Sequence, residues 1–159
     1  MDRITEKIIS LLNANVKTPR GINQIYDGDI FLIPKNSIPA IIVNPNSTAI
    51  LTKTNTQDQD TYTIDITLIL DARDYFNQSA TIKSGLAILK KIMEERKSGT
   101  SNELKTDTIA YAVRNFLDSD SDYSLRADSG IIYGFNDQRE FPTVEANLQV
   151  QVLSKVYTR

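Results

Sequence analysis

Histidine and cysteine are both absent from the 159 residues of this chain. Their absence excludes disulfides, Ser-His-Asp and Cys-His catalytic sites, zinc or haem held by those residues, and iron–sulfur clusters. The six glycines are scattered and do not form a Gly-rich phosphate-binding loop. No run approaches 18 consecutive apolar residues, and the first residues do not resemble a secretion signal. We therefore expect a soluble, unsecreted protein that takes no cofactor and does not enter a membrane.

The charge and composition are those of an ordinary globular domain. Lys and Arg number 18 and Asp and Glu number 20, which gives a net charge of −2 and no basic excess for binding a phosphate backbone. Hydrophobic residues make up 40% and charged residues 24% of the chain. At about 150 residues per domain, the length predicts one domain over residues 1–159.

Three segments have apolar residues at helical spacing. The first predicts a helix over 3–16, which ends where Pro19 interrupts the pattern. The second predicts a helix over 79–97, and the third predicts one that begins at about 102 and ends before the polar run 118–124. Each segment is apolar on one side only, so we expect these helices to pack on a sheet.

The first half of the chain also contains extended segments. Ile38–Val43 is a β-branched run, Asn44–Ser47 is rich in turn-forming residues, and Thr48–Thr52 is extended again, which together predict a hairpin. Lys53–Asp60 has no apolar side chain, and we expect a mobile loop that becomes ordered against a partner. Thr61–Leu70 alternates between polar and apolar residues and predicts a half-buried strand.

Three further segments predict strands. Ile30–Ile33, within the otherwise irregular stretch 22–37, and Ile131–Phe135 are short apolar runs. Residues 143–156 alternate over a length that would span about 45 Å if fully extended, so this strand either bends or projects beyond its domain.

The order of these elements predicts an α+β fold, with a mainly antiparallel, twisted sheet and amphipathic helices packed on one face. The inward members of the clearest periodic segments give the expected core: Ile64, Ile66, Leu68, Leu86, Leu89, Val113, Phe116, Leu148 and Val150.

Two groups of carboxylates suggest metal chemistry. Asp58, Asp60, Asp65, Asp71 and Asp74 are close enough in sequence to supply a two-metal hydrolase, although a charged outer face is the simpler interpretation. The Asp-Ser-Asp-Ser-Asp run at 118–122 begins like a calcium loop but lacks the glycine and the glutamate that such a loop needs at its sixth and twelfth positions. We therefore expect neither a catalytic nor a metal site.

Four segments carry a resemblance to a known family. They are Ile-Pro-Ala-Ile-Ile-Val at 38–43, Thr-Tyr-Thr-Ile-Asp-Ile-Thr-Leu-Ile-Leu at 61–70, Gly-Leu-Ala-Ile-Leu-Lys-Lys-Ile-Met-Glu-Glu-Arg at 85–96 and Glu-Ala-Asn-Leu-Gln-Val-Gln-Val-Leu at 145–153. With the amino-terminal amphipathic helix, their order resembles the tail terminator proteins of long-tailed bacteriophages, also called tail completion or tail-to-head joining proteins. The resemblance covers most of the chain, and the family has no invariant chemical motif that would assign a role to a residue.

The resemblance implies a structural virion protein and not an enzyme. Such proteins form a hexameric ring on the head-proximal end of the tail tube, stop its polymerisation and join the tail to the head connector. The expected partners are thus other copies of the chain, the tail tube protein and head connector or neck proteins, with DNA passing through the lumen without sequence-specific binding. The expected location is the virion tail or neck, after assembly in the host cytoplasm, with no membrane and no small-molecule substrate.

The sequence also indicates where such a protein would meet its partners. The outer side of the last strand is polar but mostly uncharged, and amide side chains can bond to a partner without the burial of a full charge. Leu153 and Tyr157 add apolar area, which we expect on the same side. The residues expected at an oligomer or tube interface are Lys53, Asp58, Asp60, Glu145, Asn147, Gln149, Gln151, Leu153 and Tyr157.

Other functions fit the same residues. A ring on the head side of the neck is the nearest alternative, followed by a carboxylate-metal nucleic-acid hydrolase and a monomeric adaptor. Divalent metal binding at Asp58, Asp60 or Asp65 would favour the hydrolase, whereas a monomer at every concentration would favour the adaptor.

Overall fold

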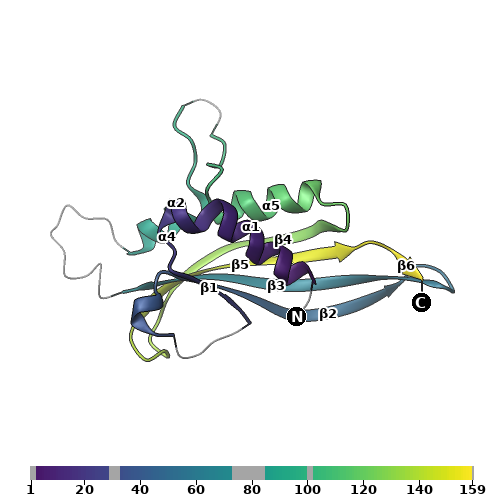
Figure 1. Cartoon of the computed structure of the whole chain (residues 1–159), viewed down its shortest axis with the longest axis horizontal. Coiled ribbons are helices and arrows are strands. Elements are labelled where there is room, and N and C mark those ends of the chain that lie inside the picture. Colours follow the sequence, from purple (N-terminus) through teal and green to yellow (C-terminus); the bar gives the residue numbers. More distant parts are fainter. Residues whose placement is uncertain (1–2, 29–32, 73–84, 100–101, 159) are drawn as a thin grey trace.

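A computed structural model describes residues 3–28, 33–72, 85–99 and 102–158, which form two layers, a sheet and a set of helices on one of its faces (Figure 1). The strands are β1 (Gln24–Asp27), β2 (Ala40–Thr52), β3 (Gln57–Asp71), β4 (Tyr123–Asn136), β5 (Thr143–Ser154) and β6 (Tyr157–Thr158). The helices are α1 (Arg3–Leu12), a π-helical turn η1 (Asn13–Lys17), α2 (Thr18–Arg20), the 3₁₀ turn η2 (Lys35–Ser37), α4 (Gly85–Glu94) and α5 (Ile109–Ser119). The α+β prediction is confirmed.

The sheet has the strand order β1-β2-β3-β5-β4. β1 and β2 are parallel, and every other pair of neighbours is antiparallel. β6 pairs with the first residues of β3, just beyond the end of β5. β5 and β6 thus pair with successive parts of the same edge of β3. The single strand predicted over 143–156 is instead interrupted after Ser154.

The main core lies between the sheet and the helices. Ile64, Leu68 and Leu148 are fully buried on the helix-covered face of β3 and β5, and α1, α4 and α5 supply the other side of this core. The predicted core is confirmed except at two positions: Phe116 is half-buried, and Leu86 is 46% exposed. Leu86 lies in the first turn of α4, and helical spacing alone cannot tell whether a partner surface lies beneath that turn.

The opposite face of the sheet carries no α-helix of the described residues and is called the helix-free face. At one end it carries a small second cluster in which the segment around η2 packs against β2 and β3. Its buried members are Ile33, Ile38, Ala40, Ile42 and Ile69.

The hairpin predicted with its turn at Asn44–Ser47 is wrong. β2 runs through this segment as one strand, with a β-bulge in which Asn46 is the extra residue between the pairs Pro45–Ile64 and Ser47–Thr63. A bulge absorbs turn-forming residues without ending a strand. The true hairpin joins β2 to β3, and its turn lies between Thr52 and Gln57.

The polar loop predicted over Lys53–Asp60 is therefore only half correct. Residues 57–60 belong to β3, and Asp58 is buried because β2 lies on one side of it and β6 on the other. Polar side chains are tolerated in this strand because its backbone hydrogen bonds are made by two neighbouring strands.

Other boundaries also differ from the predictions. The first helical segment continues to Arg20, because Pro19 lies in the first turn of α2, where no N–H is required, and Gly21 with φ of 67° ends it. The third helix begins at Ile109, since residues 103–105 pair back with 95–97. β4 begins eight residues earlier than predicted, and its bulges mask the alternation of a regular strand.

Two predictions are partly outside the described residues. The predicted strand at Ile30–Ile33 is described only at Ile33, while the neighbouring strand is β1. The predicted helix over 79–97 is described from Gly85, where α4 begins.

Candidate assembly surfaces

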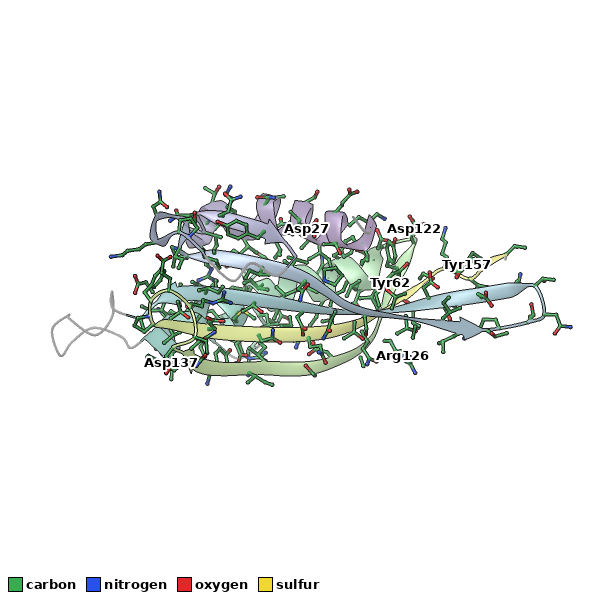
Figure 2. The ribbon with its side chains drawn as sticks, turned by 90° about the horizontal axis from the view of Figure 1, so that it is seen from below. Asp27, Tyr62, Asp122, Arg126, Asp137 and Tyr157 are labelled. Carbon is green, nitrogen blue, oxygen red and sulfur yellow. The ribbon has the colours of Figure 1, made fainter. Side chains whose placement is uncertain are left out.

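The most prominent feature of the molecule is a projecting hairpin, which we call the arm. It consists of Thr48–Thr52 of β2 and Gln57–Thr61 of β3, with β6 along one side, and it extends past the helix layer (Figures 1 and 2). Three exposed apolar side chains, Ile50, Val156 and Tyr157, lie on the arm or next to it.

Asp60 links β6 to the base of the arm. Its carboxylate accepts hydrogen bonds from the hydroxyl of Tyr157 at 2.8 Å and from the hydroxyl of Tyr62 at 3.2 Å. The side-chain amide of Gln59 donates to the carbonyl of Ser154, and the Ser154 hydroxyl accepts from the backbone N–H of Asp60. These bonds hold the carboxy-terminal residues against β3.

Four of the predicted interface residues belong to this arm region. Lys53 lies in the exposed turn, while Asp58 and Tyr157 are directly opposite each other in the β3–β6 pair. Asp60 lies on the same side of β3 as Asp58, which is the side that carries the core further along the strand.

The helix-free face has a row of polar side chains bonded across strands. Asp65 on β3 accepts a hydrogen bond from Gln149 at 3.1 Å and another from Asn46 at 3.0 Å. Two residues further along β3, at the next residue pair on the same face, the Asn147 amide donates to the Thr67 hydroxyl at 2.8 Å. Asn147 and Gln149, two of the three amides predicted at the interface, thus have partners within their own subunit and are held in fixed positions.

The other residues of β5 that were predicted at an interface also lie on the helix-free face. Glu145 accepts hydrogen bonds from Arg139, at 2.7 Å from its Nε, and from the Thr143 hydroxyl. Gln151 and Leu153 are half-buried opposite Thr63 and Thr61. Leu153 and Tyr157 therefore lie on opposite faces, because Tyr157 is opposite Asp58; the prediction that they share a side is wrong.

The carboxylates considered for a metal hydrolase are dispersed. Asp58 and Asp65 lie on opposite faces of β3, and Asp71 is six residues beyond Asp65, a distance of about 20 Å along a strand. Asp71 is buried with Lys35 at 4.0 Å, and Asp74 is outside the described residues. The described part of the chain contains no cluster of three or more potential metal-ligating side chains.

The acidic run after α5 forms ion pairs with lysines. Lys7 Nζ is 3.1 Å from Asp120 and 3.2 Å from Asp122, and Lys155 is 3.2 Å from Asp122. Burial opposes charging of Lys7, but its bonds to the two carboxylates outweigh that effect and raise its pKa. Burial likewise opposes charging of Asp120, while backbone N–H groups and Lys7 lower its pKa. The run thus joins α1 to the end of α5.

A second ionic cluster fixes the helix layer. Arg20 is 3.0 Å from Glu95 and 2.6 Å from Asp107, and Lys105 is 3.3 Å from Glu95. The hydrogen bond from Arg20, followed by that from Lys105, holds the pKa of Glu95 below its ordinary value. This cluster connects the end of the first helical segment to the connection between α4 and α5.

Sequence reasoning missed the exposed apolar residues at the sheet edges: Ile50, Ile132 and Phe135. The signal that could have revealed the first is the complete absence of charged residues from Ala40 to Thr52. An uncharged run of that length is unusual for a strand at the edge of a sheet.

Within the described residues, none of the helices has the length and apolar character needed to cross a membrane. Comparison with models of known protein families gave no match, and a search of curated proteins likewise found no matching sequence.

Proposed function

We propose that this chain is a structural subunit of a phage virion, which forms a ring on the head-proximal end of the tail tube, ends tube polymerisation and joins the tail to the head connector. The observation that carries the proposal is the asymmetry of the sheet. One face is covered by helices, and the other bears a polar row whose hydrogen bonds are made within the subunit.

This polar row is suited to the wall of a DNA channel. From Thr63 to Thr67 on β3 and from Asn147 to Gln151 on β5, the side chains on the helix-free face are hydroxyls, amides and one carboxylate. Lys and Arg bind DNA phosphates and retain the duplex, so a channel through which DNA slides is best lined without them.

The arm supplies a second argument. A projecting hairpin with an exposed Ile50 contributes little to the core of its own subunit, and exposed apolar side chains are stabilised by contact with another molecule. In a ring, arms that extend along the channel axis would reach the next object in the stack, which is the tube.

Electron microscopy of the purified full-length protein tests the proposal. We expect rings of about six subunits with an open pore, as cyclic assemblies built from heterologous interfaces close by rotation. Added to polymerising tail tube protein, the rings should cap and shorten the tubes. Light scattering that shows a monomer at all concentrations, together with tubes of unchanged length, would contradict the proposal.

A further inference from the structure

Both edges of the sheet are open among the described residues. β1 pairs with β2 only from Ala40 to Val43, which leaves the outer edge of β2 open from Asn44 to Thr52. Among the described strands, β4 at the opposite edge pairs with β5 alone. The backbone N–H and C=O groups along an open edge form a template for a strand of another molecule.

The two edges carry little of the charge that normally prevents such pairing. β2 has no Asp, Glu, Lys or Arg from Ala40 to Thr52. The first half of β4 carries Arg126, Asp128 and two β-bulges, but from Gly130 to Asn136 this strand has no charged residue. Large apolar side chains are exposed on both: Ile50 at 64%, Ile132 at 68% and Phe135 at 59%. Pro45 and the bulge beside it protect the inner part of the β2 edge, but Thr48–Thr52 has no such device.

Strand direction determines which molecule fits these edges. β2 and β5 run in the same direction, because both are antiparallel to β3, and β4 runs opposite to them. When a second copy is placed beside the first in the same orientation, its β4 is therefore antiparallel to the first copy's β2. Antiparallel pairing is what most of this sheet already uses. One chain thus supplies both complementary edges.

We infer that subunits join edge to edge, with the outer edge of Asn44–Thr52 in one copy pairing antiparallel with the outer edge of β4 in the next. This inference rests on the proposed ring function and adds the surface by which the subunits meet. It places the helix-free faces of all subunits in one continuous sheet. The contact is heterologous, so each copy uses both of its edges.

The absence of natural cysteine permits a direct test by disulfide formation. Ala49 on β2 pairs with Thr61 on β3, Thr61 pairs with Leu153 on β5, and Leu153 pairs with Ser124 on β4. Ala49 and Ser124 therefore lie at the same level of the helix-free face, and both are exposed. Two strands separate them within a subunit, so they are about 14 Å apart, twice the limit of about 7 Å for a disulfide. A bond between cysteines at these positions must therefore join two copies.

The test uses three double variants, because strand tilt in a closed sheet shifts the β4 edge of one copy along the β2 edge of the next, and each variant samples a different shift. Ala49→Cys is combined in turn with Ser124→Cys, Ala127→Cys or Ile132→Cys. At least one pair should give, on mild oxidation, a ladder of products that extends beyond the dimer. The single variants and the pair Ala49→Cys with Ser10→Cys, whose second site lies on α1, should give no ladder.

A second comparison uses a charge at the edge. Ile50→Lys should raise the concentration at which assemblies dissociate by about tenfold or more, because a desolvated charge opposes edge pairing. Leu86→Lys is the matched control, since Leu86 is also an exposed apolar residue but lies on α4. Circular dichroism should show both variants folded.

The outcomes separate this inference from the proposed function. Rings without a ladder from any double variant, or rings equally stable in Ile50→Lys and in the parent, would overturn edge pairing and leave the ring function standing. Efficient dimers from Ala49→Cys alone would indicate two-fold pairing and also overturn it. A ladder from open filaments without rings would support edge pairing and contradict the proposed function, and a monomer at all concentrations would overturn both.

Discussion

The hydroxyl of Tyr157 donates a 2.8 Å hydrogen bond to the carboxylate of Asp60, across 97 residues of sequence. This bond fixes the last strand to the base of the arm, where β5 has ended and β3 would otherwise lose a neighbour. β6 thus helps to hold the arm in place, and its Tyr157, labelled in Figure 2, lies opposite Asp58, next to the turn of the arm.

Tyr157→Phe should release β6 without unfolding the domain. Hydrogen exchange at residues 157–158 should become faster, while the global free energy of unfolding falls by about 1 kcal/mol or less, the usual net contribution of one hydrogen bond. Tyr26→Phe is the control, because the Tyr26 hydroxyl has no hydrogen bond to a described residue. Unchanged exchange at 157–158 would show that strand pairing alone holds β6.

Leu148→Ala should destabilise the domain by about 2 to 5 kcal/mol, through lost burial and the cavity that remains. Leu148 is fully buried in the centre of β5, between β3 and β4. Chemical denaturation measures the change. Leu86→Ala, at an exposed position, should cost less than about 1 kcal/mol, and equal losses at the two sites would contradict the described core.

Glu95→Gln should remove part of the acid sensitivity of the fold. Because the pKa of Glu95 in the folded state lies below the ordinary value of 4.5, its ion pairs stabilise the protein fully above that pH, and the stabilisation is lost as the pH falls through the lowered pKa. Thermal melting from pH 7 to pH 3 should therefore show a shallower decline for Glu95→Gln than for the parent. Equal slopes would assign acid unfolding to other carboxylates.

Thr108→Ala should cost about 1 kcal/mol, the usual loss when a helix cap is removed. The buried Thr108 hydroxyl accepts from the backbone N–H of Tyr111 at the start of α5 and donates to the carbonyl of Lys105. Thr108→Ser keeps both bonds and should retain most of the stability. Similar losses in the two variants would attribute the effect to the methyl group.

Gln149→Lys combined with Gln151→Lys tests whether the helix-free face lines the channel. We expect rings to persist in sedimentation, since neither side chain lies on an open edge, and double-stranded DNA to be retained in a salt-dependent manner by the added charges. Ser10→Lys with Asn13→Lys adds the same charge to the exposed side of the first helical segment and is the control. Loss of rings in the first variant alone would make this face the subunit interface.

The sequence was a good guide wherever periodicity persisted over many residues. The alternation in Thr61–Leu70 and in 143–154 predicted both central strands and their buried faces, because each strand buries one side under helices. The spacing of Ile4, Ile8 and Leu12 likewise predicted the buried face of α1.

Prediction from the sequence failed where pairing with neighbouring strands overrides the secondary-structure preference of the residues themselves. Asn44–Ser47 has the composition of a turn, yet it is strand because it pairs with β3. Gln57–Asp60 has the composition of a loop, yet it is strand because β2 and β6 pair with it and satisfy its backbone hydrogen bonds. The candidate surfaces were predicted in part. The polar row on β5 was identified, but its partners Asp65 and Thr67 and the open edges depend on long-range pairing that periodicity does not encode.

The bulge at Asn46 acts as a phase shift within β2. Before it, Ile41 and Val43 point to the helix-covered face, whereas after it the even-numbered residues, including Ile50, take that side. Had the strand continued without the extra residue, Ile50 and Leu51 would exchange faces along the whole arm. Removing one residue would thus exchange the side chains on the two faces of β2 in the arm, while the part of β2 in the core keeps its register with β3. The side chains that the arm presents to a partner can therefore change without any change in the core that supports it.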